Sequence, residues 1–260
     1  MLKFTVIISG LLLSFYGYAQ INNITDKNGK KQGYWQKKDS NGKLIYEGRF
    51  VNDIPTGTFK YFHENGALKA VNEFSQDGKN VQSIMYHENG NKLGEGRYVD
   101  EKKDGLWKYY SDDGVLLSEE NYSEGKKDGV FKIFYRNGTL SEEKNWKNDV
   151  EYGSWQQFFE SGKAKTRGNY KNGFLEGKVF FYYPDEKIKS EGVYQHAVKN
   201  GVWTYYKKTG EIDYTETYDL GVLKSGGKEN LITPEEIERE KQKYEQETEQ
   251  LKQNSNPKNE

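Results

Sequence analysis

The sequence predicts an all-β fold, an antiparallel meander of β-hairpin repeats followed by a C-terminal helical tail. Three observations indicate it. Glycines recur at intervals of 24 residues, a second glycine follows nine residues after most of them, and aromatic residues occupy fixed positions in between. Aromatics make up 15% of the chain, with 21 Tyr among them. Because large flat side chains with polar tips suit half-buried strands, this composition favours a sheet.

The first residues have the pattern of a secretory signal. Lys3 precedes an apolar run over residues 4–15, and small residues two apart, Gly17 and Ala19, follow it. We expect a signal peptide over residues 1–19 with cleavage near Ala19, and therefore an exported protein, periplasmic or secreted. The run is shorter than the roughly 20 apolar residues of a membrane-spanning helix, so no transmembrane segment is predicted.

Residues 20–32 are expected to form an N-terminal cap or half repeat, because they contain a single Asn28-Gly29 turn. The main array follows over residues 33–224 as eight 24-residue units. Each unit begins at a position that we call its mark. The marks are Gly33, Gly57, Val81, Gly105, Gly129, Gly153, Gly177 and Gly201.

Each unit is predicted to be one hairpin. Nine residues after the mark, seven units carry glycine, and Asn or Asp precedes it in five of them, as in Asn41-Gly42 and Asn65-Gly66. Asn-Gly between two apolar-patterned runs is typical of a two-residue type I′ turn, whose central residues both have positive φ. Longer charged segments such as 123–128 are expected to be loops between hairpins.

That turn fixes the strand register. It places the aromatic residue two past the mark opposite the position fifteen past it, so that Trp35 lies opposite Gly48 and covers it. It also sets Lys132 against Glu143 and Lys108 against Glu119, pairs of opposite charge. A further aromatic ends the second strand in all eight units, seventeen residues past each mark.

The pattern stops after Gly226-Gly227, and residues 225–260 are predicted to form a charged C-terminal helix or tail. Thr233 and Pro234, followed by two acids, are typical of a helix start. Three apolar residues then recur at intervals of seven: Ile237, Tyr244 and Leu251.

With the units aligned, "GLWKYYSDDGVLLSEENYSEGKKDG" at 105–129 and "GVWTYYKKTGEIDYTETYDLG" at 201–221 resemble the MORN-repeat variant of the YwqK-type antitoxin family. The resemblance covers about three quarters of the chain and departs from the pattern at Val81, Ser83 and residues 184–186. It implies a scaffold of MORN-like hairpins that binds other molecules, with an antitoxin- or immunity-like role in some relatives. It implies no catalytic residues.

Two sets of side chains raise the question of a catalytic or metal site. His63 and His87 stand in matching "HENG" segments of adjacent units, and glutamates recur fourteen residues past the marks (Glu47, Glu95, Glu119, Glu143 and Glu191). A solvated position near a turn, or on a solvated face, accounts for both sets. A hydrolase that uses the glutamates remains an alternative, but motifs such as G-x-S-x-G and H-E-x-x-H are missing. We therefore predict no enzyme, no catalytic residue, no metal and no cofactor.

A second aromatic row is the candidate binding strip. Its members lie five residues past the marks, on the face opposite the tryptophans if the alternation of the strand holds. It is made of Phe62, Tyr86, Tyr110, Phe134, Phe158, Tyr182 and Tyr206. The strip is either half covered by neighbouring side chains or an exposed surface for a partner.

The predicted function is that of an exported, non-enzymatic repeat scaffold that binds another protein. The alternative is a module that binds a glycan or another cell-surface ligand, because "WKYYSDDG" is also similar to cell-wall-binding repeats. The formal net charge of −1 gives no electrostatic reason for binding nucleic acid, and none is predicted as a partner.

Overall fold

The computed structural model describes residues 23–228 and Arg239. The predicted signal peptide lies outside these residues, and so does the predicted tail over residues 225–260 except for residues 225–228 and Arg239. Residues 23–228 contain no helix, and they fold into twenty β-strands that pair antiparallel as a meander. The predicted all-β meander is therefore confirmed.

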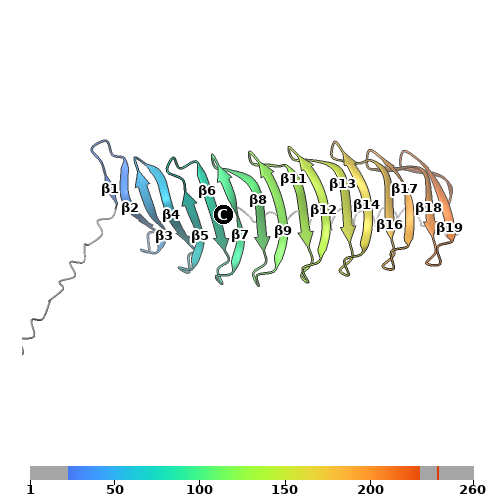
Figure 1. Ribbon diagram of the computed structural model, residues 1–260, viewed down its shortest axis with the longest axis horizontal. Coiled ribbons are helices and arrows are strands. Elements are labelled where there is room, and N and C mark those ends of the chain that lie inside the picture. The colour runs from blue at the N-terminus through green and yellow to red at the C-terminus, as the bar shows by residue number, and fades with distance from the viewer. Residues whose placement is uncertain (1–22, 229–238, 240–260) are drawn as a thin grey trace, which may run out of the picture. The chain divides into compact units, whose positions relative to one another are not determined.

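The chain divides into two compact units. Unit 1 comprises residues 1–116 and 122–125, and unit 2 comprises residues 117–121 and 126–260. In Figure 1 the strands of each unit follow one another in chain order. The strands of unit 1 are β1 (Ile24–Thr25), β2 (Lys31–Lys38), β3 (Leu44–Val51), β4 (Ile54–Phe62), β5 (Leu68–Phe74), β6 (Asn80–Tyr86), β7 (Lys92–Val99) and β8 (Lys102–Tyr110).

Strand β9 (Leu116–Ser123) has its middle residues in unit 2 and its ends in unit 1. The other strands of unit 2 are β10 (Lys126–Lys127), β11 (Gly129–Phe134), β12 (Leu140–Lys147), β13 (Val150–Phe158), β14 (Ala164–Lys171), β15 (Phe174–Leu175), β16 (Gly177–Tyr182), β17 (Ile188–Gln195), β18 (Val198–Tyr206), β19 (Ile212–Asp219) and β20 (Val222–Gly226).

The predicted register within the hairpins is confirmed. Trp35 pairs with Gly48 in hairpin β2–β3, and Lys132 pairs with Glu143 in hairpin β11–β12. The Lys132 ammonium lies 3.7 Å from the Glu143 carboxylate, so the expected ion pair forms.

The predicted turn type is wrong. In the turn of β2–β3 only Gly42 has positive φ, at 80°, and its N–H donates to the carbonyl of Asp39 at 3.1 Å. The Asp39 N–H donates in turn to the carbonyl of Lys43. This is a type I turn whose last residue is a left-handed glycine, a connection with three residues between the paired strands rather than two.

A bulge restores the register that this longer turn would have shifted. Lys38 pairs with Leu44 while Lys37 pairs with Tyr46, so Ile45 is left without a partner. The same shift occurs four to five residues past the mark in the other hairpins whose register extends that far. The two deviations cancel, which is why the simpler two-residue turn predicted the correct pairing of Trp35 with Gly48.

Type I′ turns do occur, at the opposite end of the strands, where charged loops were expected. Asn52 and Asp53 have φ of 53° and 70°, and the flanking residues Val51 and Ile54 pair directly. Asn148 and Asp149 repeat this geometry in unit 2. Each such turn also binds the previous hairpin, because the Asp53 N–H donates to the carbonyl of Lys31 at 3.2 Å, 22 residues earlier.

The core is the row of side chains two residues past the marks, and we call this side of the sheet the tryptophan face. Seven of the eight members are at most 8% exposed, and Trp35 at the N-terminal end is half-buried. The buried members are Phe59, Ser83, Trp107, Phe131, Trp155, Val179 and Trp203.

The ring that covers a strand glycine comes from the next hairpin, which corrects the prediction for Trp35 and Gly48. A Cβ on Gly48 would lie 2.4 Å from the ring of Phe59, and one on Gly96 would lie 2.3 Å from the ring of Trp107. At Gly168 the ring of its own hairpin is among the nearest groups, with Trp155 at 3.3 Å. The aromatic rows therefore bind one hairpin to the next.

Candidate binding surface

The candidate binding strip lies on the face opposite the tryptophans, which we call the strip face. Tyr110 and Tyr206 hydrogen-bond to Glu95 and Glu191, which pair through the backbone with residues three past the marks. Residues three past the marks directly follow the buried residues two past the marks, and successive side chains of a strand point to opposite faces. The two glutamates and their tyrosines therefore lie on the face opposite the tryptophans. All seven members of the strip are half-buried.

Polar side chains of the preceding hairpin hold the strip tyrosines in place. The Tyr110 hydroxyl donates to Glu95 Oε1 at 2.7 Å, and the Tyr206 hydroxyl donates to Glu191 Oε1 at 2.6 Å. The hydrogen bond to Glu191, together with burial, raises the pKa of Tyr206. The Arg167 guanidinium lies over the Tyr182 ring at 5.6 Å, a cation–π contact. The rings of Tyr110, Tyr182 and Tyr206 are thus held in place. Equivalent strip positions in neighbouring hairpins are about 9.5 Å apart, because two strand spacings separate them.

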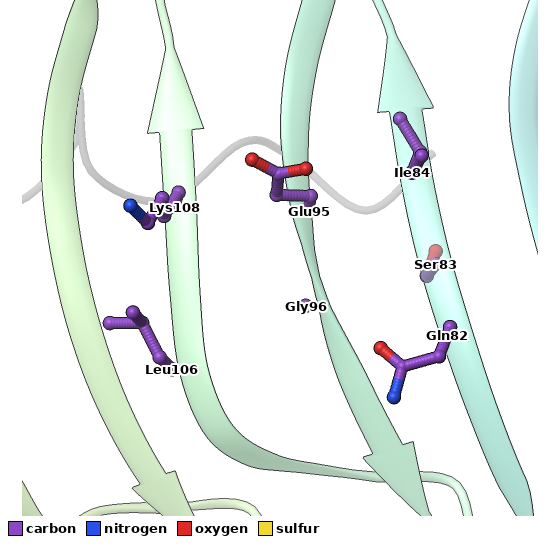
Figure 2. A pocket seen from close by; sticks show the side chains of 7 residues that line it. All are labelled: Gln82, Ser83, Ile84, Glu95, Gly96, Leu106 and Lys108. Atoms are coloured by element: carbon purple, nitrogen blue, oxygen red, sulfur yellow. The ribbon is translucent and has the colours of Figure 1, made fainter.

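Unit 1 has a shallow depression on the strip face, with a volume of about 330 Å³. Figure 2 shows it over three neighbouring strands, with Glu95 of β7 between Ile84 of β6 and Lys108 of β8. Leu106 closes the lower side and is 45% exposed. The lining residues are Gln82, Ser83, Ile84, Glu95, Gly96, Leu106 and Lys108.

An ionised carboxylate that is paired with a lysine stands in this depression. Glu95 accepts hydrogen bonds from Lys92 Nζ at 2.9 Å and from Tyr110. The bond from Lys92, and then that from Tyr110, hold the pKa of Glu95 below its usual value, so the carboxyl is ionised at neutral pH. An apolar pair, Ile84 and Leu106, flanks it. The depression can therefore receive a group with an apolar part and a polar or charged part.

The two "HENG" histidines serve the packing of hairpins. His63 Nε2 lies 2.9 Å from the carbonyl oxygen of Tyr86, and His87 Nε2 lies 3.1 Å from that of Tyr110. Since a carbonyl only accepts, Nε2 donates in both bonds. Tyr135 and Tyr183 make the same bond from the same position, with their hydroxyls 2.8 Å from the carbonyls of Phe158 and Tyr206.

The glutamates of the strip face are likewise engaged with neighbouring groups. Glu47 accepts hydrogen bonds from the Tyr34 hydroxyl at 2.6 Å and from the Gln36 amide at 3.2 Å, and Glu143 pairs with Lys132. Across residues 23–228, no three His, Asp or Glu side chains converge in a way that could hold a metal ion. Among the residues that the structure describes, there is no helix long and apolar enough to cross a membrane.

The sequence did not indicate four lining residues of the depression as site residues: Gln82, Ile84, Leu106 and Lys108. They occupy the positions one and three past the marks, where the residue type varies from unit to unit. The alternation of the strand could have indicated them, because side chains one, three and five residues past a mark lie on the same face of the sheet. Only the pairing of β6, β7 and β8 shows that they surround one glutamate.

Comparison with known proteins gives one family and a set of solved structures that are only distantly similar. The MORN repeat variant description matches residues 31–52, 55–76, 103–124, 127–148, 151–172 and 175–196, together just over half of the chain. Hairpins β6–β7 and β18–β19 lie outside these segments but have the same pairing of the second residue past the mark with the fifteenth. No curated protein matches the chain.

The solved structures are similar only in part. TarM is 16% identical with a TM-score of 0.28, and a TarM mutant from S. aureus in complex with Fondaparinux, alpha-GlcNAc-glycerol and UDP is 14% identical with the same score. Each covers 37% of this chain and 19% of its own. TcdB2-TccC3 is 15% identical with a TM-score of 0.22, and covers 73% of this chain and 11% of its own. This chain thus spans less than a fifth of the length of each.

Proposed function

This chain belongs to the MORN repeat variant family, and from that premise we propose that it is an exported, non-enzymatic scaffold that binds a protein partner on its strip face. We further propose that the array contains eight units, since hairpins β6–β7 and β18–β19 share the register of the matched segments. An antitoxin- or immunity-like role would be one form of this activity, and it is supported by the sequence resemblance alone.

One observation carries the proposal. The sheet uses its tryptophan face for its own core, while the strip face presents aromatic rings at regular intervals, held by Glu95, Arg167 and Glu191. Tyrosines fixed before binding lose little side-chain entropy when a partner covers them, and aromatic residues are enriched among the residues that dominate protein interfaces. In unit 1 the depression beside Tyr110 adds a charged and an apolar contact.

The test is capture by the full mature chain from envelope and culture fractions, repeated with matched variants. We expect Tyr86→Ser combined with Tyr110→Ser to lose the captured protein. Tyr152→Ser should retain it, because Tyr152 is a 44% exposed tyrosine that is not part of the strip. Capture that survives in the double variant, or capture of nothing by the unaltered chain, would remove the proposal.

The depression favours a second candidate, a glycan or cell-surface ligand. Its rim combines the Glu95 carboxylate, the Gln82 amide and the apolar side chains of Ile84 and Leu106, a mixture typical of sites for small polar ligands. Titration of surface polysaccharides against the chain, followed by isothermal calorimetry, tests this function. Heat that disappears in Glu95→Gln and persists in Glu73→Gln would support it, and the absence of heat would exclude it.

A further inference from the structure

Unit 2 carries a row of exposed apolar side chains that we call the rim ridge. Three of them stand three residues before a mark, and the fourth follows 24 residues after the third. It comprises Val150, Phe174, Val198 and Val222, which begin β13, β15, β18 and β20 beside the type I′ turns. Their exposed fractions are 43%, 49%, 38% and 58%. It is separate from the candidate binding strip, which lies near the other ends of the strands.

The rim ridge is continuous from one hairpin to the next. Val150 Cγ1 lies 3.7 Å from where a Cβ on Gly173 would stand, in the following turn. The rings of Phe174 and His196 are in edge contact at 6.2 Å, and Val198 Cβ lies 3.3 Å from the Cβ position of Gly221. Val150, Phe174 and Val198 thus each contact the next turn, and each keeps much of its surface exposed.

Unit 1 lacks such a row. Its residues at the same position are Lys30, Ile54, Gly78 and Lys102, of which only Ile54 is a large apolar side chain, 41% exposed. A contiguous apolar row on a chain with mean hydropathy of −1.04 is more than the scattered exposure that a protein surface normally shows. The difference between the units indicates that something covers this rim in unit 2.

The spacing of the rim ridge fits an amphipathic helix. Successive members stand two strand spacings apart, about 9.5 Å. A helix with an apolar residue at every seventh position repeats every ~10.5 Å, since it rises about 1.5 Å per residue. The two periods differ by about 1 Å, so a helix lying across the turns can place one apolar side chain at each hairpin over three hairpins.

The chain contains one segment with that period. Ile237, Tyr244 and Leu251 recur at seven after the Thr233-Pro234 start, and the segment follows β20, whose first residue Val222 is the last member of the rim ridge. Six residues, 227–232, join the two and can reach about 20 Å. This length suffices for the segment to turn back over unit 2.

One charge beside the rim ridge suits such a helix. Lys171 pairs with Phe174, towards the end where the helix would finish, and basic groups stabilise helix C-termini. Asp219 and Lys147 are already engaged in ion pairs with Lys224 and Asp128, at 3.5 and 2.9 Å. Residues 233–254 carry seven Glu against four Lys or Arg, which complements Lys171.

We propose that residues 233–251 fold back as a helix and dock Ile237, Tyr244 and Leu251 on the rim ridge of the same chain. The occupant is the protein's own C-terminal segment. This contact does not depend on the partner or on the strip face, so it stands or falls separately from the proposed function.

Amide hydrogen exchange on the full mature chain tests the docking. The N–H groups of Gly173, Ala197 and Gly221 report on it, because each donates to the previous hairpin beside the rim ridge, at 3.0, 2.9 and 2.8 Å. We expect their exchange to quicken by about tenfold or more when Ile237, Tyr244 and Leu251 are all changed to Ser. Asp53, which makes the same bond in unit 1, should keep its rate.

The matched control changes Glu238, Glu245 and Lys252 to Ser, which keeps the seven-residue spacing on another side of the helix and should leave the three rates unchanged. On the ridge side, Phe174→Ser should quicken the amides of residues 237–251, and Ile54→Ser should not. Equal exchange in the unaltered chain and the apolar triple variant would overturn the proposal. Protection that weakens on dilution would instead identify a second copy as the occupant, and protection seen only with an added partner would identify that partner; either result overturns it.

Discussion

At the scale of single residues, three strand glycines (Gly48, Gly96 and Gly192) pack tightly against the ring of the residue eleven positions later. A Cβ on Gly192 would lie 2.3 Å from the Trp203 ring, whereas one on Gly168 would meet its nearest neighbours at 3.3 Å. The first distance is shorter than the non-bonded contacts that Cβ atoms make in proteins. The second requires the neighbouring side chain to move by only a few tenths of an ångström. Glycine at Gly192 therefore allows Trp203 to reach 1% exposure.

We expect Gly192→Ala to destabilise unit 2 by about 1–3 kcal/mol, because the added methyl forces the ring of Trp203 away from its position. Gly168→Ala, in the same unit, should cost less than about 1 kcal/mol. Urea unfolding followed by Trp fluorescence measures both. Equal midpoints for the two variants would show that the rings do not pack on these glycines as described.

The histidine of the "HENG" segments is expected to be replaceable by another long donor. His63→Tyr should keep the stability of the protein, since tyrosine makes the equivalent bond at Tyr135 and Tyr183. His63→Ala should lose about 0.5–1.5 kcal/mol, the net contribution of one hydrogen bond. Thermal unfolding of the two variants distinguishes them, and a Tyr variant as unstable as the Ala variant would contradict the assigned bond.

At the scale of elements, most hairpins have two chemically different ends. One end is a type I turn with a left-handed glycine, stabilised by side chains such as Asn65, whose Oδ1 accepts the Ala67 N–H at 2.9 Å. The other end is a type I′ turn with two left-handed residues, as at Asn148 and Asp149. A turn with two positive φ values tolerates few residue types, because a Cβ is strained in that region.

This difference predicts the outcome of substitutions at Asn148, where φ is 49°. Asn148→Gly should be neutral or slightly stabilising, because glycine adopts that conformation freely. Asn148→Val should cost about 1–2 kcal/mol, because the left-handed conformation is strained for a β-branched residue. Chemical unfolding provides the measurement, and a valine variant as stable as the glycine variant would rule out a type I′ turn at this place.

The sequence predicts the hairpins, their register and the face of the strip, because these follow from glycine spacing and strand alternation. It does not predict that Phe59 rather than Trp35 covers Gly48, since that depends on how one hairpin is shifted against the next. The bulge between Glu47 and Arg49 sets this shift, and no turn motif marks it. The depression and the rim ridge were missed for the same reason, because each forms from several hairpins at once.

At the scale of the whole molecule, the tryptophan face holds many ionisable groups. Burial raises the pKa of Tyr61 and Tyr98, and burial together with the Glu216 carboxylate raises that of Tyr205. Burial alone would lower the pKa of Lys144, but Glu142 and Glu151, at 3.5 and 3.0 Å, raise it overall. The protonated forms of all these groups are favoured by the folded state.

Stability should therefore be lost in alkali. A group whose folded pKa lies above its unfolded value stabilises the fold fully below the unfolded pKa, which is 10.0 for Tyr and 10.5 for Lys, and loses this contribution as the pH rises through the folded pKa. We expect the urea midpoint to be constant between pH 7 and 9 and to fall above pH ~10. Tyr205→Phe should make the fall shallower, and Tyr152→Phe, an exposed control, should not. A midpoint that is flat to pH ~11 would contradict the burial of these phenols.

The bonds that join one hairpin to the next all have short reach along the chain. Backbone bonds such as Gly173 to Glu151 span 22 residues, and side-chain bonds such as His63 to Tyr86 span 23. Contacts of this kind require the closure of small loops only. Folding can therefore start at any hairpin and propagate to its neighbours. The same locality makes the 24-residue block a portable module, since a hairpin added or removed as a whole alters only the two junctions beside it.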